Sequence, residues 1–175
     1  MTPAAELKKL MQRPPVLSVA AAESLTGGHV QAMITSVAGS SEYFRGGLTA
    51  YTLDGKVKCL GVNRAHARRA NSVSQQVAVE MAAGACRLFD ADLAVSATGY
   101  AQPAREHGIR VPMAWWAICH RQGGGSAVII SGCVEVRGEK RVAVQHRVAE
   151  TVLRELVKYV RELHGARRRA KKKKR

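Results

Sequence analysis

Residues 16–28 read VLSVAAAESLTGG, and this stretch decides how the rest of the chain is interpreted. Its apolar run, Val16 to Ala22, is typical of a buried strand. The run stops at a carboxylate, two hydroxyls and a double glycine, and a helical pattern follows. A hydroxyl on such a strand-to-helix turn lies beside the free N–H groups of a helix N-terminus, which favour negative charge. We therefore predict either that Ser24 is a nucleophile or that the turn binds an anion.

The size and composition of the chain predict one globular domain over residues 1–164. The chain has 175 residues and is 46% hydrophobic, which is enough to bury one good core. No apolar stretch is long enough to cross a bilayer and the N-terminus lacks a signal-peptide core, so we expect a cytoplasmic protein. The four cysteines have no paired spacing and no histidine partners at ligand intervals, which favours reduced thiols over a metal site or disulfides.

Residues 165–175 carry much of the positive charge of the chain. The net charge is +15, and this segment holds eight of the 28 Lys and Arg residues and none of the 13 acidic residues. The remainder of the chain therefore carries +7. Because the segment repels itself and has no apolar periodicity, we expect a disordered basic tail. Such a tail either acts as a solubilising extension or attaches loosely to nucleic acid, an acidic partner or an anionic membrane surface.

Hydrophobic periodicity predicts helices and strands that alternate along the chain. Helices are expected over 3–13, 26–37, 54–60, 74–88 and 140–163. Strands are expected over 16–22, 48–52, 92–98, 113–120 and 127–136, with Gly123-Gly124-Gly125 as a flexible hairpin turn. Alternating elements followed by a hairpin predict an α/β fold: a three-layer α/β/α sandwich around a mixed sheet of about five strands.

Polar side chains follow three of the predicted strands, and ligands collect where the strands of such sheets end. Glu23-Ser24 follow the first strand, Tyr51 to Lys56 the second, and Thr98-Gly99 the third. A serine nucleophile needs a base, and Lys56 is a better candidate than any histidine, provided that burial or nearby positive charge lowers its pKa. We expect Tyr51 to relay or hold the proton and Thr98 to orient Lys56.

The same residues have plainer interpretations, which the sequence leaves open. Ser24 or Thr26 is equally suited to cap the helix that follows. A lone lysine such as Lys56 is usually a solvated surface cation, Tyr51 at a strand end usually packs, and Thr98 is compatible with an ordinary strand residue. The chemistry of the residues alone therefore does not choose between catalysis and structure.

Four motifs together resemble one family, in the right order and at nearly unchanged spacing. They are AESLTGG at 22–28, GSSEYFRGGLTAYTLDGKVKCLGV at 39–62, SVSQQVAVEMAAGA at 72–85 and ADLAVSATG at 91–99. The chain is similar to the C-terminal domain of the CinA (competence/damage-inducible) proteins, the nicotinamide-nucleotide amidohydrolase family. The resemblance implies a three-layer α/β/α fold, a homo-oligomer, and neither metal nor cofactor. It also implies hydrolysis of the amide of nicotinamide mononucleotide to nicotinate mononucleotide and ammonia.

The resemblance further implies roles for individual residues. Ser24 falls on the position of the family's nucleophile and Lys56 on that of its base, while Tyr51 and Thr98 fall on further catalytic positions. The residues expected to bind substrate are Glu23, Thr26, Gly27, Gly28, Ser40, Ser41, Gly99 and Arg141. Backbone N–H groups around Thr26-Gly27 are expected to stabilise the oxyanion of a tetrahedral intermediate.

The chain departs from the family pattern mainly in the loop over residues 100–113, which reads YAQPAREHGIRVPM. Gln102, Arg105-Glu106 and Met113 stand where the family has glycines, and bulkier side chains there reshape the mouth of the pocket. Two hypotheses therefore stay open. One is a serine–lysine amidohydrolase acting on nicotinamide mononucleotide or a related amide. The other is a catalytically impaired, nucleotide-binding sensor or interaction module of the same fold.

Overall fold

The structure is a computed structural model that describes residues 1–122 and 127–173. At its centre lies one mixed sheet of five strands in the order β2-β1-β3-β4-β5. The strands are β1 (Val19–Glu23), β2 (Phe44–Thr49), β3 (Leu93–Tyr100), β4 (Met113–Arg121) and β5 (Ala127–Glu135). β1 pairs in parallel with β2 and β3, whereas β4 is antiparallel to both β3 and β5. The predicted mixed sheet is confirmed.

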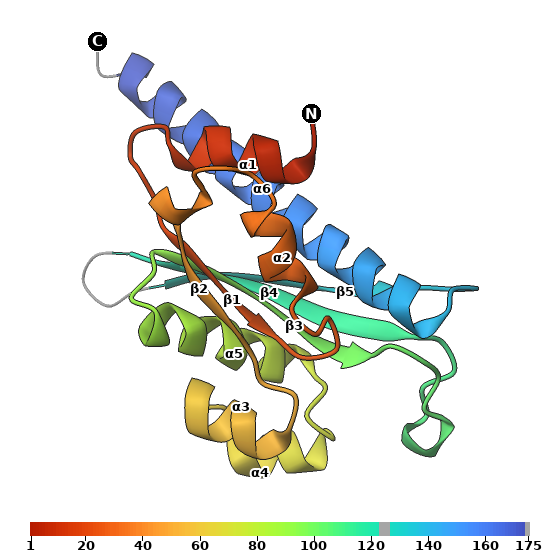
Figure 1. Cartoon of the computed structure of the whole chain (residues 1–175). Helices are drawn as coiled ribbons and strands as arrows, with labels where there is room; N and C mark the ends of the chain where they lie inside the picture. The colour runs from red at the N-terminus through yellow and green to blue at the C-terminus, as the bar shows by residue number, and fades with distance from the viewer. Residues whose placement is uncertain (123–126, 174–175) are drawn as a thin grey trace.

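Helices cover both faces of this sheet, which confirms the three-layer α/β/α fold (Figure 1). One face is covered by α1 (Pro3–Met11), α2 (His29–Thr35) and α6 (Arg141–Lys173). The other face is covered by α3 (Leu53–Leu60), α4 (Arg64–Arg69) and α5 (Gln75–Leu88). Two 3-10 turns complete the described chain, η1 (Ser40–Glu42) and η2 (Arg105–His107). None of the helices within the described ranges is long and apolar enough to cross a membrane.

β1 is buried on both faces because helices pack on each side of it. All five of its residues are buried, and they alternate between two cores. Val19 and Ala21 belong to the core under α1 and α6, while Ala20 and Ala22 belong to the core under α5. The continuous apolar run of the sequence is therefore the pattern of a central strand with both faces covered.

The start of β2 and the presence of α4 differ from the sequence prediction. β2 begins at Phe44 rather than at residue 48, because Gly46 and Gly47 lie inside the strand. Gly46 is needed there because a Cβ at this position would lie 2.7 Å from the ring of Phe89. α4 was not predicted because its sequence RAHARR has no apolar periodicity; the side chain of Asn63 caps it by accepting from the His66 N–H at 2.9 Å. The predicted hairpin turn at 123–125 lies outside the described residues.

The basic segment at the C-terminus also differs from its prediction. Disorder was expected over 165–175, but α6 continues to Lys173. Arg, Lys and Ala have high helix propensity, and the packed part of α6 already provides the helical nucleus that an isolated segment would have to form. Cations near a helix C-terminus also interact favourably with the helix dipole. These three effects favour a helix over the described part of this segment.

Candidate active site

The carboxyl ends of β1, β2 and β3 meet at one edge of the sheet because these three strands run parallel. Ser24 directly follows β1, and α3 begins shortly after β2. The hydroxyl of Thr52 caps α3 by accepting from the Gly55 N–H at 3.1 Å. This cap fixes the first turn of α3, which carries Lys56 back toward the end of β1.

Ser24 and Lys56 form a buried pair. The Lys56 Nζ donates a hydrogen bond to the Ser24 Oγ at 2.9 Å. Ser24 is 6% exposed and Lys56 is 2% exposed, so both side chains are almost entirely shielded from water. The pair spans 32 residues of sequence and joins the ends of two neighbouring strands. The structure therefore brings together the hydroxyl and the amine that the sequence analysis paired.

Burial changes the protonation of Lys56. Removing the charged form from water lowers its pKa from 10.5 to about 8. Among the described residues, no carboxylate forms an ion pair with the Lys56 ammonium that would oppose this effect. About a tenth of the molecules then carry a neutral Lys56 amine at pH 7. Lys56 is therefore a buried amine with a real neutral population, not the solvated surface cation of the plainer interpretation.

Glu23 holds the turn that presents Ser24. Its carboxylate accepts hydrogen bonds from the N–H groups of Gly28, Val30 and Gln31 at 3.0, 3.1 and 2.9 Å. These donors belong to the start of α2, where an anion is favoured. With a residue exposure of 1%, the Glu23 carboxylate is not accessible to a substrate. In the structure the backbone at the start of α2 occupies the Glu23 oxygens, and substrate binding by Glu23 stays an untested prediction.

The backbone that follows Ser24 presents unpaired N–H groups. The Gly27 N–H donates to the Ser24 carbonyl at 3.0 Å, so it is already used. The N–H groups of Leu25 and Thr26 have no hydrogen-bond partner among the described residues. The buried Thr26 hydroxyl likewise has none there. Leu25 and Thr26, rather than Gly27, therefore carry the backbone N–H groups that stay available in this turn.

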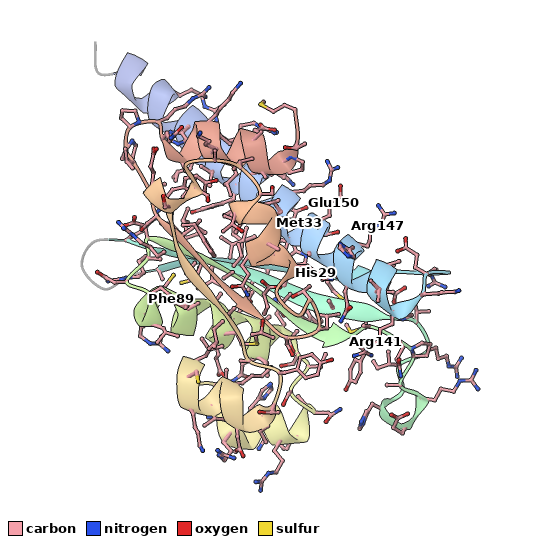
Figure 2. All side chains as sticks on the ribbon, viewed as in Figure 1. His29, Met33, Phe89, Arg141, Arg147 and Glu150 are labelled. Atoms are coloured by element: carbon pink, nitrogen blue, oxygen red, sulfur yellow. The ribbon has the colours of Figure 1, made fainter. Side chains whose placement is uncertain are left out.

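A cavity of about 470 Å³ opens over the Ser24–Lys56 pair. Six of the expected site residues line it: Ser24, Tyr51, Lys56, Thr98, Gly99 and Arg141. The Arg141 guanidinium donates to the Tyr51 hydroxyl at 2.7 Å and to the Gln102 side-chain oxygen at 3.3 Å. Figure 2 shows Arg141 near the start of α6. α6 and the loop over 101–112 therefore close the cavity together with the end of β2.

The structure assigns Tyr51 and Thr98 to contacts other than those expected. The Tyr51 side chain is 54% exposed at the mouth of the cavity, and its hydroxyl accepts from Arg141, not from the Ser24–Lys56 pair. The Thr98 hydroxyl donates to the Ser72 carbonyl at 2.8 Å. No hydrogen bond joins either residue to Lys56 within the described residues. Tyr51 and Thr98 thus make other contacts in the structure, and their expected roles toward Lys56 stay predictions.

The other residues expected to bind substrate do not line the cavity. Gly27 and Gly28 adopt positive φ angles of 62° and 107°, so they serve the turn itself. Ser40 and Ser41 belong to η1, which precedes β2 and therefore lies at the opposite edge of the sheet from the ends of the parallel strands. Thr26 is fully buried. Backbone geometry accounts for the two glycines, and strand direction excludes the two serines from this cavity.

Sequence reasoning missed the turn that forms another wall of the cavity. Asn71 and Ser72 line it and adopt the left-handed conformation, with φ angles of 46° and 61°. The Asn71 side chain donates to the Tyr100 hydroxyl at 2.9 Å. Left-handed residues other than glycine are uncommon and concentrate at functional sites, although asparagine tolerates the conformation best. The sequence Asn71-Ser72 before a helix was the available signal.

Comparison with known proteins identifies a family. The family model described as the CinA C-terminal domain matches residues 3–160. A "CinA-like protein" of Chlorobium limicola is 39% identical over 150 residues, which are 85% of this chain and 35% of that protein. A "putative competence-damage inducible protein" of Halothermothrix orenii is 43% identical over 98 residues, 56% of this chain and 24% of that protein. This chain thus spans about a third or less of the length of these relatives.

Solved structures show the same fold. The CinA superfamily protein from Enterobacter cloacae matches with a TM-score of 0.80 and 28% identity over 91% of this chain and 93% of that one. The CinA superfamily protein from Escherichia coli matches with a TM-score of 0.77 and 25% identity over 89% of this chain and 86% of that one. The sheet and its helices are therefore similar to structures already solved in this superfamily.

Proposed function

The chain belongs to the CinA C-terminal domain family, and we propose that it hydrolyses the carboxamide of nicotinamide mononucleotide, or of a related nucleotide, to a carboxylate and ammonia. The observation that carries the proposal is the hydrogen bond of 2.9 Å between the buried Lys56 amine and the Ser24 hydroxyl. Serine alone is a poor nucleophile, and a neutral amine within hydrogen-bond distance is a base that can activate it.

In the proposed first step, the neutral Lys56 amine removes the proton of the Ser24 hydroxyl as the Ser24 Oγ attacks the carboxamide carbon. The negative charge that develops on the carboxamide oxygen is stabilised by the free N–H group of Leu25, which lines the cavity. One such donor is typically worth about 3–4 kcal/mol in the transition state. The C–N bond then breaks, Lys56 returns its proton to the leaving nitrogen, and ammonia departs from an ester on Ser24.

In the second step, water replaces ammonia in the site. The neutral Lys56 amine takes a proton from the water, and the resulting hydroxide attacks the ester carbon. The bond between the Ser24 Oγ and the acyl carbon breaks, and Lys56 returns the proton to Ser24. The carboxylate product leaves, and the pair is restored for another cycle. One buried lysine with a pKa of about 8 is suited to both proton transfers, because both of its protonation states are populated near neutral pH.

Arg141 is the candidate for binding the nucleotide phosphate in this proposal. Its guanidinium lies at the cavity wall, is exposed, and donates one hydrogen bond each to Tyr51 and Gln102. A guanidinium can bind a phosphate through two parallel hydrogen bonds. Tyr51 and Tyr100 add aromatic surface against which a planar ring can pack.

A nucleotide-binding module without turnover is the second candidate, and the loop over 101–112 favours it. Glu106 and His107 of this loop line the cavity, so a carboxyl group and an imidazole ring share it with the Ser24–Lys56 pair. If these side chains prevent the carboxamide from reaching Ser24, the cavity still binds a nucleotide but does not hydrolyse it.

Ammonia release from nicotinamide mononucleotide tests the first candidate against the second. We expect release by the unmodified chain, loss of release in Ser24→Ala, and no change in Ser36→Ala. Ser36 is a matched control because it is an exposed serine at the end of α2, outside the cavity. Equal rates in the unmodified chain and Ser24→Ala would refute hydrolysis by Ser24. A rise in melting temperature with the nucleotide but no ammonia would leave only the binding module.

A further inference from the structure

A second hollow adjoins the cavity that holds Ser24 and Lys56. Its volume is about 260 Å³, and it lies beside the turn between α4 and α5. The two spaces share Asn71, Val73, Tyr100 and His107 as lining residues. Because these side chains face both spaces, a single wall of residues separates the second hollow from the candidate active site.

This shared wall is held by specific contacts. The Asn71 side chain donates to the Tyr100 hydroxyl at 2.9 Å, and the rings of Tyr100 and His107 lie 5.8 Å apart. Asn71 itself has a left-handed backbone, with a φ of 46°. A non-glycine residue in this conformation costs about 1 kcal/mol or more, so the surrounding structure has to enforce it. Specific contacts of the fold therefore hold this wall in place.

The lining of the second hollow is suited to a planar ring. Three aromatic rings line it, those of Tyr100, His107 and Trp115, and Ile109 and Met113 add apolar surface. Neither Ser24 nor Lys56 is among the described residues that line this hollow. Such ring surfaces are suited to the planar part of a ligand, and Arg69 and Asn71 add polar groups beside them.

One guanidinium belongs to each of the two spaces. Arg69, at the end of α4, lines the second hollow, and Arg141 lines the first. Arg69 is exposed and forms neither an ion pair nor a side-chain hydrogen bond with any described residue. Each space therefore offers one arginine and one aromatic surface. A ligand with two rings joined by a link that carries two negative charges would place one ring in each space and its charges near the two arginines.

We propose that the substrate is a dinucleotide, whose carboxamide ring binds beside Ser24 and whose second ring binds in the hollow lined by Trp115. The pyrophosphate that joins its two halves crosses the wall of Tyr100 and His107 and contacts Arg69 and Arg141. This inference rests on the proposed function and names the substrate class of the same site. The mononucleotide then fills only the first cavity and leaves the second hollow unused.

Binding to the Ser24→Ala chain tests this inference without turnover. The probes are nicotinamide mononucleotide, nicotinamide adenine dinucleotide and adenosine monophosphate, measured by titration calorimetry. We expect the dinucleotide to bind at least about tenfold more tightly than the mononucleotide, because it gains the second ring and the second arginine. Adding Arg69→Gln to this chain should weaken dinucleotide binding by about three- to tenfold and leave the affinity for nicotinamide mononucleotide unchanged.

Arg68→Gln is the matched control for Arg69→Gln. Arg68 is the preceding residue of α4, is likewise exposed to solvent, and does not line either space. The two variants lose the same charge from the same helix, so a difference between them reports contact with the ligand. We expect Arg68→Gln to leave the affinities for all three probes unchanged. A second variant, Trp115→Leu, should weaken the binding of the dinucleotide and of adenosine monophosphate without changing the affinity for nicotinamide mononucleotide.

The outcomes separate this inference from the proposed function. If the dinucleotide binds no more tightly than the mononucleotide, or if Arg68→Gln and Arg69→Gln have equal effects, the second ring site is refuted. Ammonia release from the mononucleotide would then still support hydrolysis by Ser24. Ammonia release from the dinucleotide but not from the mononucleotide would support the inference and restrict the substrates of the proposed function to dinucleotides. If none of the three probes binds, both are refuted.

Discussion

Raising the pH should increase the rate of amide hydrolysis until Lys56 has lost its proton. Burial lowers the pKa of Lys56 to about 8, and only the neutral amine can accept the proton of Ser24. The neutral fraction is then about 9% at pH 7, about 50% at pH 8 and about 90% at pH 9. The value of kcat/KM should therefore rise about fivefold from pH 7 to pH 8, less than about twofold from pH 8 to pH 9, and then level off.

The assay is the initial rate of ammonia release at a substrate concentration below KM, in buffers of constant ionic strength. Lys56→Arg provides the control, because a guanidinium keeps its proton over this whole pH range and cannot act as a base. We expect this variant to lose at least about 100-fold in kcat/KM and to show no inflection near pH 8.

A lysine of ordinary pKa gives a different curve. Its neutral fraction rises about 100-fold between pH 7 and pH 9 and does not level off below pH 10. Such a curve, or a rate that does not depend on pH, would refute the assignment of Lys56 as a buried base with a lowered pKa.

Three further changes have defined outcomes. Lys56→Met should raise the free energy of unfolding by about 2–3 kcal/mol at pH 7 while abolishing activity, because the folded state binds the proton of Lys56 less tightly than the unfolded state does. This gain in stability should shrink as the pH rises from 8 to about 10.5. Urea unfolding that shows a less stable variant at pH 7 would contradict the cost of burying the Lys56 charge. Glu23→Gln should lower the free energy of unfolding in urea by about 2–3 kcal/mol and lower kcat, because one amide oxygen cannot satisfy three N–H donors. An unchanged free energy of unfolding would contradict the capping of α2 by Glu23. Arg141→Gln should raise KM about tenfold with a small change in kcat, whereas Arg147→Gln, on the same helix but outside the cavity, should change neither; equal effects on KM would remove Arg141 from the phosphate site.

Much of the fold could be predicted from the sequence because its strands are regular. The apolar run that ends at Ala22 indicated a strand covered on both faces, and Ser74 supplied a clear N-cap for α5 by accepting from the Val77 N–H at 3.1 Å. The boundaries of β2 were harder to predict, because Gly46 resembles a turn residue until the ring of Phe89 is seen against it. α4 has no apolar stripe, so periodicity gave no signal for it.

The Ser24–Lys56 pair could be predicted because strand direction alone brings the ends of β1 and β2 together. The same rule should have excluded Ser40, which precedes β2 and lies at the other edge of the sheet. The role of Glu23 depends on backbone N–H groups five to eight residues later, and these converge on it only once α2 has formed. The strained turn at Asn71 is set by tertiary contacts and has no periodic signal.

Covalent labelling of Ser24 by a fluorophosphonate measures most directly whether a buried amine activates this hydroxyl, since the adduct is permanent and needs no knowledge of the substrate. Peptide mass spectrometry of the labelled chain should place the adduct on Ser24, and Lys56→Gln should slow its formation by at least about 100-fold. A chain that stays unlabelled at Ser24, or one that is labelled equally fast without the Lys56 amine, would contradict nucleophilic catalysis by this pair.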